Sequence, residues 1–247
     1  VAALATHAVA LSGLAEDLLI YANRGFFEPS DDYASTSSIM PQKVNPDTLE
    51  LVRAHAGDAV GDLSGLLSTL KGLPRAYNRD LQRATPHAWD AVDAVTEATD
   101  VAAGAVATGS WDAEALAAAA GEGFSTATGV ADLLAASGVP FRTAHEVVAA
   151  AAGRAEGTPD LATLDAAAGD LLDDPLFSYV SREAVEAALD PVESFRSRDS
   201  AGGPAPAAVA AALDDAEAAL DADREALAAL REALEAAADA LDAEVAT

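Results

Sequence analysis

The chain has 247 residues, of which 41 are acidic and 14 basic, so its formal net charge at pH 7 is −27. A charge of this size repels nucleic acids and anionic membrane surfaces, and we expect neither as a partner. Cysteine is absent, which excludes disulfides and thiolate chemistry. No apolar run reaches the length that we expect of a transmembrane helix.

Three explanations compete for the acidity. A disordered acidic tail disagrees with a chain in which 51% of the residues are hydrophobic. A cation-binding site lacks a sequence signature, because no Asp-x-Asp-x-Asp-Gly loop is present. We favour an acidic surface suited to a salt-rich cytoplasm, where salt screens the repulsion between like charges. This interpretation predicts a cytoplasmic protein of a salt-adapted organism.

The first predicted elements are two helices separated by a loop. Apolar residues at helical spacing predict a helix over residues 1–23, which Gly25 ends. Its apolar face carries Leu4, Leu11, Leu14 and Leu18. Residues 26–45 are expected to form the loop. The next helix is predicted over residues 46–70, with a heptad stripe made of Leu49, Val52, Ala56, Val60, Leu63, Leu67 and Leu70. Glycines at four-residue intervals, Gly57, Gly61 and Gly65, indicate a face where another helix packs closely.

A third long helix is predicted over residues 78–108, with a kink or restart at Pro86. Beyond it the apolar pattern shortens, which indicates a small domain of short helices. The last segment repeats leucine every seven residues, and these are Leu213, Leu220, Leu227, Leu234 and Leu241. We therefore predict an all-α protein in three parts. Residues 1–110 belong to a long-helix bundle, residues 111–203 form the small domain, and residues 204–247 form an amphipathic helix that packs on its own subunit or on a neighbour.

The most informative stretch lies between the first two helices. Residues 35–47 read Ser-Thr-Ser-Ser-Ile-Met-Pro-Gln-Lys-Val-Asn-Pro-Asp. Pro46 suits the first turn of a helix, and a helix N-terminus attracts anions through its free N–H groups and its dipole. A cation at Lys43, with hydroxyl and amide donors around it, suits a carboxylate. The stretch therefore predicts a site for a carboxylate ligand.

This stretch resembles the signature of the fumarase/aspartase superfamily, Gly-Ser-Ser-x-Met-Pro-x-Lys-x-Asn-Pro, with Thr36 in place of the glycine. Gln42, before the lysine, is similar to the argininosuccinate lyase branch. A second block agrees with that branch, because residues 70–82 read Leu-Lys-Gly-Leu-Pro-Arg-Ala-Tyr-Asn-Arg-Asp-Leu-Gln. Weaker similarities follow at residues 123–128, 138–146 and 198–205. The resemblance runs from residue 1 to about residue 213.

The resemblance implies elimination across a succinyl Cα–Cβ bond with release of fumarate. It implies that Ser37 is the base and that Lys43, with the helix N-terminus, stabilises the carbanion. It also implies substrate contacts by Ser38 and Asn45, and contacts to the arginine end of the substrate by Tyr77 and Gln82. Where several relatives place a lysine three residues after this glutamine, the chain has Thr85. The alternatives are structural: a turn or helix-capping role for Ser37, Ser38 and Asn45, a packing role for Tyr77, and a place on the helix surface for Gln82.

The resemblance implies no cofactor, and the sequence predicts no metal. The four histidines lie at positions 7, 55, 87 and 145, without metal-ligand spacing. We expect His87 to be structural and His145 to pack within the small domain.

The expected function is that of the C-terminal half of an argininosuccinate lyase from a halophilic archaeon. Family members carry roughly as much chain again before this point, so the resemblance places a catalytic histidine outside the chain and predicts an inactive fragment. It also implies a homotetramer whose active sites draw residues from several subunits. Two rivals stay open: another fumarate-releasing lyase (fumarase, aspartase or adenylosuccinate lyase), and a non-catalytic assembly protein such as the related lens crystallins.

Overall fold

The structure is a computed structural model that describes residues 1–36, 39–40 and 44–245. It confirms the all-α prediction, since helices account for 72% of the chain. Two short antiparallel strand pairs, of two residues a strand, are the exception among the described residues. The chain separates into two compact units, residues 1–119 and 120–247. The division into parts 1–110, 111–203 and 204–247 stays a prediction.

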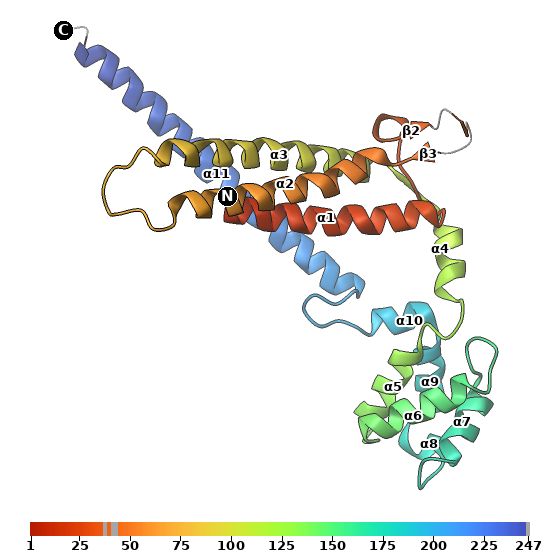
Figure 1. The fold of residues 1–247 in the computed structure, drawn as a ribbon. Helices are drawn as coiled ribbons and strands as arrows, with labels where there is room; N and C mark the ends of the chain where they lie inside the picture. The colour runs from red at the N-terminus through yellow and green to blue at the C-terminus, as the bar shows by residue number, and fades with distance from the viewer. Residues whose placement is uncertain (37–38, 41–43, 246–247) are drawn as a thin grey trace. The chain divides into compact units, whose positions relative to one another are not determined.

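The first unit is built on three long helices that lie side by side: α1 (Ala2–Asn23), α2 (Asp47–Leu70) and α3 (Leu81–Thr108) (Figure 1). Their bounds agree with the predicted ones within three residues. Glycines with positive φ follow two of them, Gly25 at 75° after α1 and Gly72 at 72° after α2. Such angles cost glycine little, which is why the helices end there.

Most of the buried positions on these helices are alanine rather than leucine. The buried positions on them are Ala5, Ala8, Ala15, Leu18, Leu49, Val52, Ala56, Ala59, Ala91, Val95, Ala98, Ala102 and Ala105. Small side chains let the helix axes approach closely, and larger ones then lie at the edges. The predicted faces were therefore partly wrong: Leu14, Val60, Leu67 and Leu70 are exposed. A 3.5-residue repeat drifts around a helix of 3.6 residues per turn, so the C-terminal half of the α2 stripe turns away from α1 and α3.

Helix α3 continues through Pro86, so of the two predicted outcomes the restart did not occur, and the kink stays a prediction. Next to the proline, the His87 ring packs against Gly65 of α2, where an added Cβ would lie 2.6 Å from Nε2. His87 Nδ1 is 3.0 Å from Asp62 Oδ1. Close packing at the glycine face of α2 is thus seen at Gly65, whereas Gly57 and Gly61 face open space within this chain.

Helix α1 corrects the expectation about apolar runs. Its length and composition are those of a membrane-crossing helix, with a mean hydropathy of 1.4 in its most apolar window. The same helix packs on α2 and α3 through Ala5, Ala8, Ala15 and Leu18, as a core helix of a bundle does.

Strand β1 (Phe27–Glu28) pairs with β4 (Ser110–Trp111) at the end of α1 and α3. The Trp111 ring lies 4.9 Å from Phe27 and 6.1 Å from Tyr21, between ring centroids. Helix α4 (Ala113–Ala120) follows the pair. The aromatic contacts therefore join the loop after α1 to the segment that leaves α3.

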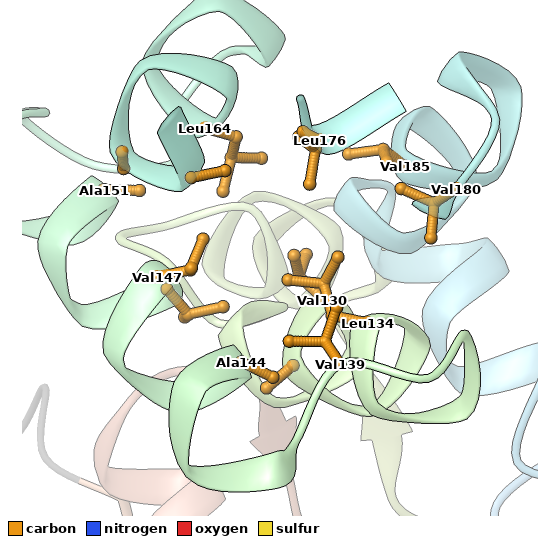
Figure 2. Close-up of a cluster of buried hydrophobic side chains, with 14 residues drawn as sticks. Val130, Leu134, Val139, Ala144, Val147, Ala151, Leu164, Leu176, Val180 and Val185 are labelled. Carbon is orange, nitrogen blue, oxygen red and sulfur yellow. The ribbon is translucent and has the colours of Figure 1, made fainter. Parts of the chain in front are cut away.

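The second unit contains a cluster of short helices around a core of larger side chains. The helices are α5 (Ala127–Ala136), α6 (Phe141–Ala152), α7 (Leu161–Gly169), α8 (Leu176–Tyr179), α9 (Arg182–Leu189) and α10 (Pro191–Arg196). Figure 2 shows Leu134, Leu164, Leu176 and Val147 directed toward one another. His145 lies on the exposed face of α6, so its predicted burial in this core was wrong.

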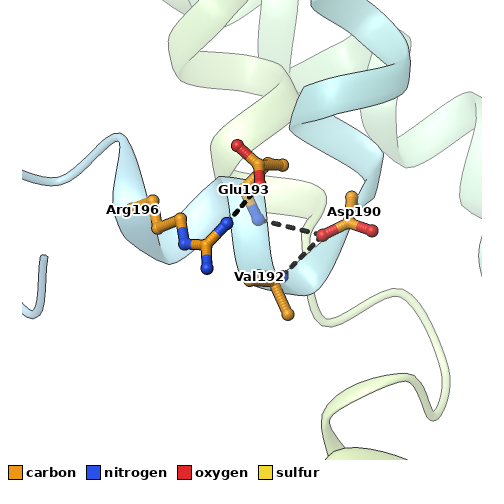
Figure 3. A network of polar contacts seen from close by, with 4 residues as sticks. All are labelled: Asp190, Val192, Glu193 and Arg196. Carbon is orange, nitrogen blue, oxygen red and sulfur yellow. Dashed lines mark hydrogen bonds and ion pairs between the residues drawn. The ribbon is translucent and has the colours of Figure 1, made fainter. Parts of the chain in front are cut away.

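Side-chain caps define the starts of three of these helices. Asp160 accepts from Thr163 N, and Ser181 accepts from Ala184 N. Asp190 accepts from the backbone of Val192 and Glu193 at 2.8 and 2.9 Å, and Arg196 then pairs with Glu193 (Figure 3). Capping satisfies N–H groups that have no partner within the helix.

The last helix, α11 (Pro206–Val245), is 40 residues long. Its heptad leucines, Leu213, Leu220, Leu227, Leu234 and Leu241, are all exposed. Packing of this helix on its own subunit or on a neighbour stays a prediction.

Candidate active site

The two ends of the signature stretch meet in a short hairpin. Strand β2 (Ser35–Thr36) pairs antiparallel with β3 (Val44–Asn45), so Ser35 lies opposite Asn45 and Thr36 opposite Val44. Helix α2 starts directly after β3. Thr36, the departure from the superfamily pattern, thus occupies an extended strand position, where a β-branched residue is favourable.

Three predicted site residues, Ser37, Ser38 and Lys43, lie outside the described residues. The residues next to them in the sequence are described: Thr36, the last residue of β2, precedes Ser37, and Val44, the first residue of β3, follows Lys43. The pairing of β2 with β3 therefore brings the chain entering Ser37 beside the chain leaving Lys43.

Asn45 borders a hollow of about 270 Å³ at the start of α2. The hollow lies between α1 and α2, and Glu50 and Arg53 form part of its wall. Arg53 makes an ion pair with Glu16 of α1. Asn45 is half-buried, and the hollow beside it offers both charged and apolar surface.

The start of α2 combines the partial positive charge of its free N–H groups with two negatively charged side chains. Pro46 holds the N-cap position without a side-chain cap, and Asp47 and Glu50 lie in the first turn. These carboxylates favour the helix by interacting with its dipole, and they reduce the positive potential that the N–H groups offer to an anion. A carboxylate site here therefore depends more on a fixed cation than the sequence argument assumed.

Tyr77 and Gln82 lie far from the hairpin. Tyr77 is 73% exposed in the loop between α2 and α3, and Gln82 is exposed in the first turn of α3. This loop is at the opposite end of α2 from β2 and β3 (Figure 1). The 24 residues of α2 rise about 36 Å at 1.5 Å per residue. Thr85 is exposed near the same end as Gln82. The structure thus places the two blocks of predicted site residues at opposite ends of one bundle.

Among the described residues, no group of three histidine or carboxylate side chains is arranged to hold a metal ion. His55, His87 and several acidic residues border an open groove between α2 and α3. The ring of His55 is 3.4 Å from Asp58 and 3.9 Å from Glu97, and His87 faces Asp62. His55 thus lies near two carboxylates and His87 near one.

Comparison with known proteins decides the family. Residues 1–61 match the family described as lyase, and residues 124–196 match that described as argininosuccinate lyase C-terminal. The argininosuccinate lyase of Haloarcula marismortui is 66% identical over 211 residues, 84% of this chain. That of Halobacterium salinarum is 68% identical over 219 residues, 87% of this chain.

The chain belongs to the argininosuccinate lyase family. It spans 42% and 44% of the length of these two relatives and corresponds to their C-terminal part. A solved structure of an EDDS lyase variant with bound fumarate is similar over 91% of this chain and 46% of that one, with 32% identity and a TM-score of 0.76. The superfamily resemblance seen in the signature is thereby confirmed.

Sequence reasoning missed contacts of the residues near the hairpin. The ion pair of Arg53 in α2 with Glu16 in α1 joins residues 37 positions apart in the sequence, and no local pattern indicates it. Tyr33 and Gly104, which lie against each other, were also missed. A lone glycine within a helical pattern was the available signal, since such a residue often has a packing reason.

Proposed function

We propose that the whole protein is an argininosuccinate lyase, which cleaves argininosuccinate to arginine and fumarate without a cofactor. The observation that carries the proposal is the 66–68% identity to argininosuccinate lyases over most of the chain. The signature stretch lies within residues 1–61, which match the lyase family. The superfamily fold and the hairpin that joins the two ends of the signature support it.

In the proposed reaction, Ser37 removes a proton from the Cβ carbon of the succinyl group, next to a carboxylate. The electron pair of the broken C–H bond moves into that carboxylate, which becomes a doubly charged aci-carboxylate. Lys43 stabilises this charge, and such electrostatic stabilisation is often the largest catalytic contribution. The pair then forms the Cα–Cβ double bond of fumarate as the C–N bond breaks. The guanidino nitrogen takes the bonding pair and a proton from a general acid, and arginine leaves.

A serine hydroxyl is a weak base unless a neighbour favours its alkoxide. Lys43 is close in sequence and carries a fixed positive charge, which lowers the free energy of an alkoxide nearby. Ser38 and Asn45 hold the substrate carboxylates by hydrogen bonds. This role for Asn45 fits its half-buried place beside the hollow at the start of α2.

The assignment of Tyr77 and Gln82 to the arginine end of the substrate requires more than one subunit. Within one chain they lie about one length of α2, roughly 36 Å, from Asn45. Argininosuccinate cannot span that distance, so one copy would supply the signature hairpin and another the Tyr77–Gln82 block. We therefore propose a homo-oligomer with shared active sites, a homotetramer as in the family resemblance.

The substrate is tested with the full-length protein, by following fumarate release. Argininosuccinate should react, whereas malate and aspartate should not. Preferential turnover of malate or aspartate would move the protein to another branch of the superfamily. An intact oligomer without any lyase activity would favour the non-catalytic assembly protein.

The role of Lys43 is tested by Lys43→Met, which keeps the aliphatic stem and removes the charge. We expect the loss in kcat to exceed the loss in substrate affinity, because the charge acts on the aci-carboxylate more than on the ground state. Arg224→Met is the control, since Arg224 is exposed on α11 and lies outside both blocks of predicted site residues. A fall in affinity alone would make Lys43 a ground-state carboxylate binder.

Site sharing is tested by mixing two inactive variants, Ser37→Ala and Gln82→Ala. If each site combines the two blocks from different copies, some hybrid oligomers contain a site with neither substitution, and activity returns after subunit exchange. Mixtures that stay inactive while exchange is demonstrated would contradict the shared site.

A further inference from the structure

The segment that precedes the signature hairpin is fastened to two helices. The 3₁₀ turn η1 (Asp31–Tyr33) leads through Ala34 directly into β2. Thr48 of α2 donates its hydroxyl to the Tyr33 carbonyl at 2.6 Å. Ser30, just before the turn, lies with its Oγ 2.8 Å from Thr108 Oγ1 of α3. Helix α2 therefore holds the chain two residues before Ser35, and α3 holds it five residues before Ser35.

The Tyr33 ring occupies a notch in α3 that exists because residue 104 is glycine. A Cβ added at Gly104 would overlap Oη and Cζ of Tyr33 and lie 2.9 Å from Cε1. Tyr33 is half-buried and packs on the cluster that includes Ala102 and Ala105 of α3 and Leu49 of α2. Glycine inside a helix costs roughly 1 kcal/mol relative to alanine. Gly104 therefore lowers the stability of α3 locally, and the close approach of the Tyr33 ring explains why a glycine stands there.

The path from this notch to the proposed catalytic base is short. Ala34 separates Tyr33 from β2, and Thr36 of β2 precedes Ser37. The partner strand β3 ends at Asn45, which leads into α2 through Pro46. A shift of Tyr33 away from α3 moves β2 relative to the start of α2. Ser37 follows β2 in the sequence, and Asn45 is the last residue of β3.

We propose that Tyr33, seated in the Gly104 notch, is a positioning residue that sets the geometry of the signature hairpin. The proposal rests on the proposed lyase function only for its catalytic readout. Its structural part concerns the hairpin itself. Tyr33 acts through the placement of Ser37 and Asn45, and a misplacement of about 1 Å in a catalytic group can lower turnover about 10²-fold.

The first variant is Gly104→Ala in the full-length protein, which fills the notch and displaces the ring. We expect kcat to fall by about 10- to 100-fold with KM for argininosuccinate changed by less than about threefold. Gly13→Ala is the matched control, because Gly13 is also within a long helix of this unit and faces open space. The control should keep wild-type kcat. A folded Gly104→Ala oligomer with wild-type kcat would overturn the proposal.

Substitutions at Tyr33 test whether the two residues act together. Tyr33→Phe keeps the ring in the notch and should retain kcat within about twofold, as changes without lost packing do. Tyr33→Ala should lower kcat as Gly104→Ala does. The double variant should be no worse than Tyr33→Ala, because without the ring the added methyl group meets open space. Additive losses in the double variant would contradict coupling through the notch.

A readout without substrate separates this inference from the proposed function. Amide hydrogen exchange of residues 35–45 should be faster in Gly104→Ala and Tyr33→Ala than in wild type and Gly13→Ala, while exchange in α5 and α6 stays unchanged. If wild type has no lyase activity, the proposed function fails and the exchange data alone decide the positioning role. If Gly104→Ala does not fold, Thr48→Val, which removes only the hydroxyl tie, must accelerate exchange in the hairpin. Unchanged exchange in that variant would then overturn the inference.

Discussion

The long-helix unit and the short-helix unit bury their hydrophobic residues in different ways. In the long-helix unit, residues 1–119, the buried positions are mostly alanine, and large residues such as Leu67 and Trp89 are exposed, at 59% and 62%. In the short-helix cluster, leucine and valine fill a closed core, with Leu164 fully buried. The signature hairpin belongs to the long-helix unit, whose large hydrophobic side chains are exposed. Two long helices in close contact cannot cover all of their large side chains, whereas short helices packed around a centre can.

This comparison predicts different behaviour for the two regions expressed separately. Residues 120–205 should fold alone and unfold in one cooperative transition, because their core is complete. Residues 1–119 should not give a stable monomer, since their exposed apolar surface needs further helices. Urea unfolding and sedimentation of both segments test this. A cooperative monomer from residues 1–119 would break the comparison.

Leucine substitutions sharpen the contrast within the full-length protein. Leu134→Ala in the closed core should lower the free energy of unfolding of its unit by about 2–5 kcal/mol, through lost burial and the cavity left behind. Leu67→Ala should change stability within the subunit by only about 0.5 kcal/mol, as exposed substitutions do. If Leu67→Ala also weakens assembly, the open face of α2 contacts another chain. Equal losses in subunit stability would show that α2 is buried as deeply as α5.

Substitution of a predicted catalytic residue in the long-helix unit should lower turnover, whereas a substitution in the second unit should not. Ser37→Ala in the full-length protein should lower turnover by at least about 10²-fold, the lower end for loss of general base catalysis. Thermal unfolding and oligomeric state should change little, because loss of a single hydroxyl group removes little packing surface. Ser200→Ala in the second unit is the control. Wild-type turnover of the purified Ser37→Ala protein would remove Ser37 from the mechanism.

Salt should affect assembly more than the closed core. The net charge of −27 crowds carboxylates wherever copies meet, and the Debye length falls from about 10 Å near 0.1 M salt to about 3 Å near 1 M. We expect the full-length protein to lose oligomer and activity on dialysis into dilute buffer and to regain both in molar potassium chloride. Sedimentation and activity across a salt series measure this. A stable, active oligomer in dilute buffer would contradict salt adaptation and reopen the cation-binding explanation of the acidity.

The smallest expected effect concerns the caps of the short helices. Ser181→Ala removes the hydrogen bond from Ala184 N to the Ser181 hydroxyl and should lower the free energy of unfolding by about 1 kcal/mol.

Asp160 adds a pH dependence, because the side chain and backbone N–H of Thr163 hold the pKa of Asp160 below its ordinary 3.8. Its stabilisation is complete above pH 3.8 and is lost as the pH falls through the lower folded value. Asp160→Asn should abolish that part of the acid sensitivity, as measured by thermal unfolding between neutral and acid pH.

The sequence by itself determined the family, the helical class and the bounds of the long helices. Local rules suffice for these: Gly25 and Gly72 end helices because glycine accepts positive φ, and Pro46 stands at the start of α2. The signature was recognisable because catalytic elimination requires particular residues at particular spacings, whatever surrounds them.

Only the tertiary structure decided which faces are buried and which residues meet. The leucine faces predicted for α1 and α2 were partly wrong, because close helix contact selects Ala15 and Ala59, and periodicity alone does not indicate how close a neighbour lies. The seating of Tyr33 on Gly104 joins positions 71 residues apart, which no local pattern links. Such relations depend on how whole helices pack, and packing is a property of the folded chain.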